Sequence, residues 1–202
     1  MTDIFSKTSN FKPEAIEKAV VTMLDSIGEQ PSREGLQRTP KRVAKMYAEL
    51  TQGYHTDPIK LVNDALFHVD YAEMVVVKDI EFCSLCEHHL LPFFGKAHVA
   101  YLPDDKVIGL SKIPRIVEMF AQRLQVQERI TSQIANLIED ILNPRGTAVV
   151  VEGVHMCSAI RGVKKIKSSM ITSAFTGAFK ENQAIRAELM NHLNRHSNLY
   201  LG

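Results

Sequence analysis

The sequence predicts an α+β protein in which an N-terminal helical extension precedes a domain built on an antiparallel sheet. Apolar residues recur at helical spacing through most of the first sixty residues. The rest of the chain then follows the order strand, strand, helix, helix, strand, strand, which lacks the regular alternation of a parallel α/β fold. With 202 residues, 45% of them hydrophobic and 23% charged, the chain suits one globular domain with a short extension.

The extension, residues 1–60, holds two predicted helices. Between Pro13 and Gly28 the apolar residues lie three or four positions apart, and a glycine commonly ends a helix. Thr39 is a good N-cap residue, and Pro40 suits the first helical position after it. We therefore expect a second helix from this point, and a second unit that spans residues 61–202.

The second unit changes its hydrophobic period several times. Its valine-rich and alternating segments are typical of strands, whereas isoleucine and leucine at helical spacing predict helices between them. The predicted strands are Glu73–Phe82, Gly95–Leu102, Gly146–Ser158 and Ser168–Phe179, and the predicted helices are 113–123, 127–142 and 181–194.

Charge and composition exclude several classes of protein. The 24 basic and 23 acidic residues give a net charge of +1, which argues against binding to nucleic acid or to an anionic membrane. No apolar run approaches the roughly 20 residues that span a bilayer, and the start of the chain lacks a secretory signal, so we expect a cytoplasmic protein. Three cysteines are an odd number, which favours metal binding or thiol chemistry over a disulfide framework.

The segment CSLCEHH, residues 83–89, holds the densest set of reactive side chains. Thiolate and imidazole are ligands that zinc prefers, and the two-residue gap between Cys86 and His89 suits chelation from one turn. A third cysteine, Cys157, follows His155 by two positions on a predicted strand. Residues two apart on a strand point to the same face, and their backbones lie about 6–7 Å apart. Cys157 could therefore hold a metal while His155 faces whatever binds beside the metal.

These residues leave four interpretations open. A closed structural zinc site would use Cys83, Cys86, His89 and Cys157 as its four ligands. An open catalytic site would use the last three of these residues and a water molecule. Cys83 and Cys86 could instead form a redox pair, although no βαβ unit surrounds them. In the fourth interpretation the cysteines are buried and inert.

Basic residues mark two candidate anion sites. Ser111 is the predicted N-cap of a helix whose free amide groups, together with Lys112 and Arg115, suit an anion. Arg161 opens a second basic cluster directly after the strand that carries His155. The other members of this cluster, which we interpret as solvated loop charges, are Lys164, Lys165 and Lys167.

Glu128 lies in the first turn of a predicted helix. A carboxylate there usually stabilises the helix dipole. It could also accept two hydrogen bonds from an edge such as guanine N1–H and N2–H₂, and composition does not decide between these roles.

Several long motifs, in the same order, resemble the GTP cyclohydrolase I family. They are TPKRVAKMY at 39–47, CEHH at 86–89, GLSKIPRIVEMFAQRLQVQER at 109–129, VEGVHMCSAIRG at 151–162 and TSAFTGAFKENQAIRAEL at 172–189. The resemblance covers roughly residues 35–195 and favours the open zinc site.

The resemblance implies that the chain converts GTP and water to formate and 7,8-dihydroneopterin triphosphate, the entry to folate or tetrahydrobiopterin synthesis. Cys86, His89 and Cys157 match the family's zinc ligands. Zinc lowers the pKa of a bound water toward neutrality, which suits attack on C8 of the purine. His155 matches the general acid/base, and the pKa of an imidazole lies near the working pH.

The other candidate site residues follow from the same match. Glu128 would anchor guanine with Gln127 beside it, and His88 and Ser111 would assist opening of the ribose. Cys83 matches no role in the family. The residues that match triphosphate contacts are Lys112, Arg115, Arg161 and Arg42.

The fold implied by the resemblance is the T-fold, an antiparallel four-stranded sheet with two helices packed on one side. The resemblance also implies that the subunits assemble into toroidal homodecamers whose sites are shared between subunits. Two rival functions remain at this point. One is a T-fold relative that acts on another pterin or purine, and the other is a non-enzymatic module in which a structural zinc supports nucleotide or partner binding.

Overall fold

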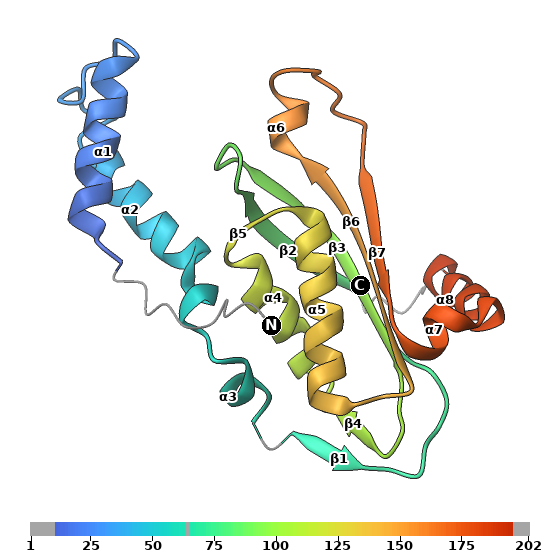
Figure 1. Cartoon of the computed structure of the whole chain (residues 1–202). Helices are drawn as coiled ribbons and strands as arrows, with labels where there is room; N and C mark the ends of the chain where they lie inside the picture. The colour runs from blue at the N-terminus through green and yellow to red at the C-terminus, as the bar shows by residue number, and fades with distance from the viewer. Residues whose placement is uncertain (1–10, 64, 196–202) are drawn as a thin grey trace, which may run out of the picture.

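Four long antiparallel strands form the centre of the molecule, which the computed structural model describes for residues 11–63 and 65–195 (Figure 1). Their order across the sheet is β2-β3-β6-β7, and the short strand β5 adds a parallel edge beside β2. A separate ribbon pairs β1 with β4. The strands are β1 Leu66–His68, β2 Val75–Cys86, β3 Pro92–Leu102, β4 Lys106–Ile108, β5 Leu124–Gln125, β6 Gly146–His155 and β7 Met170–Phe175. The predicted α+β class and the four antiparallel strands are confirmed.

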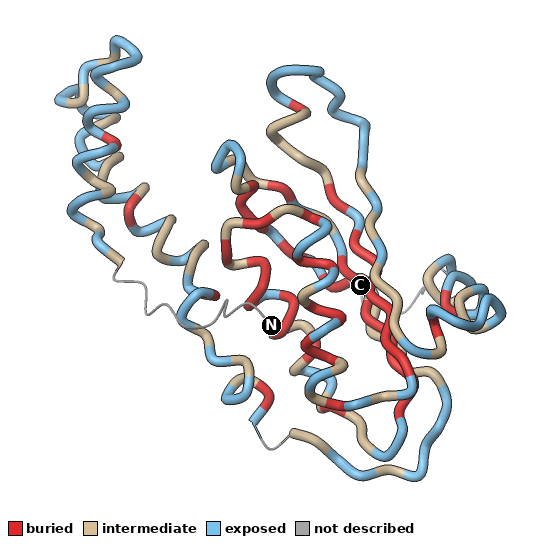
Figure 2. The backbone as a smooth tube through the Cα atoms, in the orientation of Figure 1, coloured by how far each residue is buried: buried red, intermediate tan, exposed pale blue. Residues whose placement is uncertain are grey.

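Helices α4 (Lys112–Ala121) and α5 (Gln127–Leu142) pack on one face of the sheet, and the main core lies between them and the strands. Ala97, Val99 and Tyr101 alternate along β3 toward this core, and none is more than 1% exposed. Figure 2 shows the buried backbone concentrated along these helices and the central strands. Two helices on one face of four antiparallel strands is the T-fold arrangement.

A smaller core lies on the opposite face at one end of the sheet. There α7 (Gly177–Glu181) and α8 (Gln183–Asn194) bring Phe179 and Leu189 against Ala100 of β3. Within residues 11–63 and 65–195, no helix has both the length and the apolar character needed to cross a membrane.

The N-terminal helices stand beside the sheet (Figure 1). Helix α1 (Pro13–Ser26) packs against α2 (Thr39–Leu50), and the 3-10 segment η1 (Gln52–His55) and α3 (Pro58–Val62) lead the chain toward the sheet. Helix α2 begins at Thr39, one position before the predicted start, because Arg38 occupies the N-cap position. The first ten residues of the predicted 1–60 extension lie outside the described residues, and its boundary stays a prediction.

Two predicted strands end earlier than expected. Strand β6 stops at His155, where residues Met156–Ala159 form the short helix α6. Its partner β3 begins at Pro92, so no ladder continues beyond the pair of Phe93 with His155. Strand β7 stops before Gly177, whose φ is 45° and whose Cβ position would meet the Arg145 carbonyl at 2.3 Å, so the chain turns there into α7.

Candidate active site

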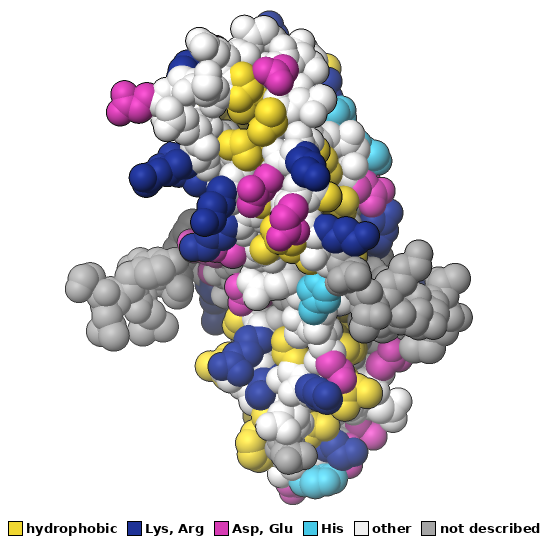
Figure 3. Space-filling model, turned by 90° about the vertical axis from the view of Figure 1, so that its left-hand side faces the viewer, with side chains coloured by type: hydrophobic (Ala, Val, Ile, Leu, Met, Phe, Trp, Pro, Cys, Tyr) yellow, Lys and Arg dark blue, Asp and Glu magenta, His cyan; other side chains and the backbone are white. Residues whose placement is uncertain are grey.

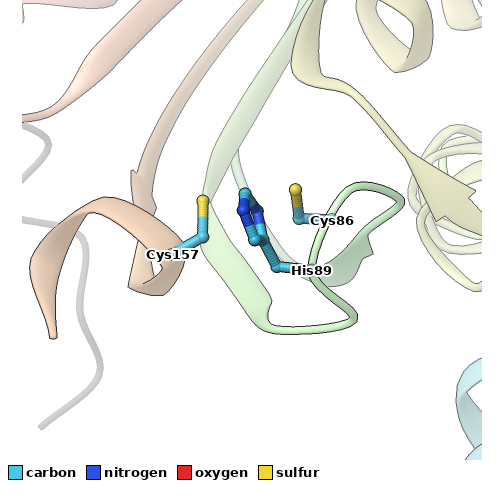
Figure 4. A group of neighbouring side chains, drawn as sticks. All are labelled: Cys86, His89 and Cys157. Carbon is cyan, nitrogen blue, oxygen red and sulfur yellow. The ribbon is translucent and has the colours of Figure 1, made fainter. Parts of the chain in front are cut away.

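The turn between β2 and β3 carries two of the predicted zinc ligands. Cys86 ends β2, and its backbone N–H donates to the carbonyl of Leu91 across the turn at 2.9 Å. The N–H of Leu90 donates back to the Cys86 carbonyl at 2.8 Å, and Leu90 takes a φ of 54°. This tight turn places the His89 ring beside the Cys86 thiol (Figure 4).

Cys157 completes the group from a different element. We predicted that Cys157 extends the strand of His155, but it lies on α6, where helical geometry turns its thiol toward the β2–β3 turn. The ligand atoms of Cys86, His89 and Cys157 all lie within 4.8 Å of one another. Tetrahedral zinc, with Zn–S of about 2.3 Å and Zn–N of about 2.0–2.1 Å, holds such atoms about 3.5–3.8 Å apart. Small side-chain movements therefore close this group on an ion.

The chemistry of the donor set also fits zinc. Burial, followed by the nearby Cys86 thiol, raises the pKa of Cys157, whereas Arg161 lowers it. A cation held between the two thiols offsets both of these effects, because metal binding stabilises the thiolates. Cys83 is exposed on β2 and is not part of the group found among the described residues. Among the described residues the group therefore offers three protein ligands, the number that catalytic zinc sites use.

His155 lies at the end of β6 and is held on two sides. Its ring stacks on the fully buried Phe93, with centroids 4.7 Å apart and planes 2° from parallel. Its Nε2 lies 2.9 Å from Oε1 of Gln127. Burial lowers the pKa of His155, and the charge of Glu128 opposes this shift. Glu128 is exposed at the start of α5, and its electrostatic effect on His155 indicates a carboxylate near the imidazole.

Two further predicted residues near the metal group come from the same turn and from the loop after α6. His88 is exposed, and its Nδ1 lies 3.8 Å from the Cys86 thiol. Arg161, on the exposed loop after α6, donates a hydrogen bond to Nε2 of His89. The structure therefore brings both predicted residues next to the metal group.

Four other predicted residues, all in the described part of the chain, do not contact the metal group. Lys112 and Arg115, on the first turns of α4, line a hollow of about 560 Å³ together with residues of η1 and α3, and no metal ligand lines it. Lys112 Nζ donates to the Leu61 carbonyl at 3.0 Å. Ser111 occupies the N-cap position of α4 without a side-chain cap hydrogen bond, and Arg42 is exposed on α2.

Sequence reasoning missed two contacts that shape this site. Arg129 of α5 makes a bidentate ion pair with Glu87, which ties the ligand-bearing turn to the helix and lowers the pKa of Glu87. Phe93 supports the His155 ring from the next strand. Neither contact has a local sequence signal, because each joins residues that are far apart along the chain.

Comparison with known proteins places the chain in a family. The family model described as GTP cyclohydrolase I matches residues 16–194. The GTP cyclohydrolase 1 of Chlorobaculum tepidum is 56% identical over 178 residues, which cover 88% of this chain and 80% of that protein. The GTP cyclohydrolase 1 of Deinococcus radiodurans is 52% identical over 179 residues, covering 89% and 83%. That of Campylobacter lari is 53% identical over 181 residues, covering 90% and 95%. With this similarity along nearly its whole length and a three-ligand metal group in place, the chain belongs to the GTP cyclohydrolase I family.

Proposed function

We propose that this chain converts GTP and water to formate and 7,8-dihydroneopterin triphosphate. The observation that carries this proposal is the three-ligand group of Cys86, His89 and Cys157, with His155 and Glu128 close by, in a chain of this family. An open metal site beside an imidazole suits hydrolysis at an electron-poor carbon such as C8 of a purine.

Each of these groups has a separate role in the proposed reaction. Cys86, His89 and Cys157 would hold the zinc, which would lower the pKa of a bound water toward neutrality. His155 moves protons to and from the purine ring as C8 is attacked and as formate leaves, and its lowered pKa keeps the neutral imidazole available. Glu128, exposed beside His155, accepts hydrogen bonds from guanine N1–H and N2–H₂.

The other assignments concern the sugar and the phosphates. His88, exposed beside the metal group, and Ser111 at the start of α4 assist opening of the ribose. The residues that bind the triphosphate are Lys112, Arg115, Arg161 and Arg42, all of them basic side chains suited to phosphate oxygens.

The arrangement of these residues supports a site shared between subunits. Arg161 contacts the metal group, whereas Lys112 and Arg115 line a hollow against η1 and α3 that no metal ligand reaches. A single GTP molecule meets both sets when one subunit supplies the metal group and another supplies the α4 cations. We accordingly infer a homo-oligomer, with the homodecamer of the family resemblance as its form.

The surface of the N-terminal helices supports the same inference. Met23 of α1 is 63% exposed, its C-cap residue Ile27 is 69% exposed, and Met46 of α2 is 41% exposed. Figure 3, which looks onto the side where these helices lie, shows apolar side chains among the charged ones. An amphipathic helix pair with an uncovered apolar face fits burial against another subunit.

Turnover of GTP by the purified protein tests the proposal. We expect the absorbance of a pterin to appear and to vanish when zinc is removed by a chelator, because the open metal site supplies the nucleophile. Two cysteine variants provide a matched control: Cys83→Ser keeps zinc and activity, whereas Cys86→Ser loses both. An absence of product from zinc-replete, assembled protein would contradict the proposed reaction and favour a T-fold relative with another substrate.

A further inference from the structure

We propose that Gln127 is a positioning residue for His155. It holds the imidazole as the tautomer that is protonated at Nε2 and leaves Nδ1 for the reaction. This inference rests on the proposed function, and it assigns the Gln127 side chain to the histidine instead of to guanine.

The orientation of the Gln127 amide is set by its surroundings. Its Nε2 donates to the backbone carbonyls of Val151 at 3.0 Å and Met170 at 2.9 Å. Carbonyl oxygens only accept hydrogen bonds, so the amide nitrogen must face them. The amide oxygen then points the other way, toward His155.

This orientation determines which nitrogen of His155 carries a proton. Oε1 of Gln127 lies 2.9 Å from His155 Nε2, and an amide oxygen cannot donate. The imidazole must therefore donate from Nε2, and in the neutral ring the lone pair lies on Nδ1. The stacking on Phe93, at 2° between the planes, keeps the ring from turning over to exchange the two nitrogens.

The Gln127 side chain is itself immobilised. It is fully buried, and its Nε2 also lies 3.2 Å from Oγ1 of Thr172. Thr172 and Thr131 share a hydrogen bond of 2.7 Å, and Thr131 Oγ1 donates to the Gln127 carbonyl at 2.6 Å. This network connects α5 to β6 and β7 and holds the amide in one rotamer.

The contact between Gln127 and His155 needs a glycine at position 153, two residues before the histidine. A Cβ at Gly153 would lie 2.7 Å from Oε1 of Gln127, which is closer than real Cβ contacts. A side chain at this position would push the amide oxygen away from the imidazole. The buried Gln127 amide is thus already paired within the subunit, at its nitrogen by two carbonyls and at its oxygen by His155.

The tautomer is measured directly by NMR on the full-length, zinc-loaded protein labelled with ¹⁵N in its histidines. At pH about 8, above the ordinary histidine pKa of about 6.5, we expect His155 to show a protonated Nε2 and an unprotonated Nδ1. In Gln127→Met, which removes the acceptor, the two tautomers should mix. A wild-type ring protonated at Nδ1 would overturn the proposal. This measurement needs no turnover, so it separates a failure of this inference from a failure of the proposed reaction.

Kinetics distinguish positioning from guanine binding. We expect Gln127→Met to lower kcat by about 10- to 100-fold, the usual effect of losing an orienting hydrogen bond, with the KM for GTP and the zinc content little changed. Gln133→Met is the matched control, because it makes the same substitution on α5 at a glutamine that bonds Gln125 and is not part of the Gln127 network. Its kcat should stay within about twofold of the wild type. A higher KM with an unchanged kcat in Gln127→Met would instead assign the residue to the substrate.

A second variant keeps the test valid where Gln127→Met does not fold. Gln127→Glu retains an oxygen that accepts from His155 Nε2, although it loses the donor to the carbonyls of Val151 and Met170. We expect this variant to keep the Nε2-protonated tautomer despite a lower melting temperature. Loss of that tautomer in a folded, zinc-loaded Gln127→Glu protein would contradict the proposal.

Discussion

His98 illustrates how one residue makes local structure depend on protonation. Its Nδ1 accepts the backbone N–H of Asp79 at 3.1 Å, and Asp79 takes a φ of 59° where the register of β2 shifts. A protonated imidazole could not accept this bond. Burial, the largest effect, lowers the pKa of His98. The charged groups that modulate it are Asp79, Lys96, Glu152 and Lys78.

We predict that His98 makes the protein less stable in mild acid. Because its pKa is lower in the folded protein than in the unfolded chain, the stabilisation is present above the ordinary value of about 6.5 and is lost as the pH falls through the folded pKa. His98→Asn keeps an acceptor but cannot titrate, so its urea midpoint should fall less than that of the wild type between pH 7.5 and 5.5. The exposed His68 provides the control variant His68→Asn, which should behave like the wild type. Equal losses in His98→Asn and the wild type would refute the assignment.

Residue type and spacing predicted the metal group better than the contacts around it. Residue type made Cys83, Cys86, His89 and Cys157 candidate ligands, the family resemblance selected the last three, and the structure brings those three together. Spacing could not predict that Gln127 reaches His155, because that contact depends on how α5 lies against β6. A glutamine beside an acid at a helix start carries no local sign of which partner it takes.

At the scale of elements, a close approach at Gly53 helps join the N-terminal helices to the sheet domain. Gly53 of η1 lies so near the end of α4 that a Cβ there would meet the Met119 carbonyl at 2.0 Å. Its N–H donates to the Gln122 carbonyl at 3.0 Å, and buried Arg123 donates from Nε to the Gly53 carbonyl at 3.0 Å. Tyr54 OH accepts the N–H of Leu124 at 3.0 Å. These contacts set the position of α2 relative to the site.

We predict that Gly53→Ala destabilises this junction by about 1–3 kcal/mol, the usual cost of forcing extra volume into a packed position. Backbone atoms surround the site, so no flexible side chain can move aside. The midpoint of urea denaturation measures the loss. Gly35→Ala is the matched control, because its Cβ would meet only the tip of the Arg33 side chain, at 3.1 Å. A midpoint for Gly53→Ala equal to that of the control would contradict the predicted clash.

Long, periodic elements were predictable and short ones were not. The four main strands and helices α4, α5 and α8 have enough residues to show their period. Strands β1, β4 and β5 have only two or three residues each, so no period can be seen in them. Helix α6 exists because the ladder of β6 ends with its partner, which a sequence read one segment at a time does not show.

At the scale of the whole molecule, the two halves of the proposed site belong to different regions of the subunit. The metal group, His155 and Arg161 lie at the end of the sheet where β2 meets β3. Arg115 lies on α4 beside η1 and α3, which also carry the connection to the N-terminal helices. In this proposal assembly serves catalysis directly, because a neighbouring subunit brings the second half to the first.

Mixing inactive variants tests that arrangement. His155→Ala and Arg115→Ala each damage one half of the site. A site is intact only when both of its contributing subunits carry the undamaged half. Assemblies formed from an equal mixture should therefore regain about a quarter of wild-type turnover. Cys86→Ser mixed with His155→Ala should stay inactive, because both residues belong to the half supplied by one subunit. GTP turnover by the co-refolded mixtures, with their oligomeric state checked by light scattering, provides the measurement. If the first mixture forms assemblies but remains as inactive as the second, each subunit must build its site alone, and Arg115 must reach the metal group of its own chain.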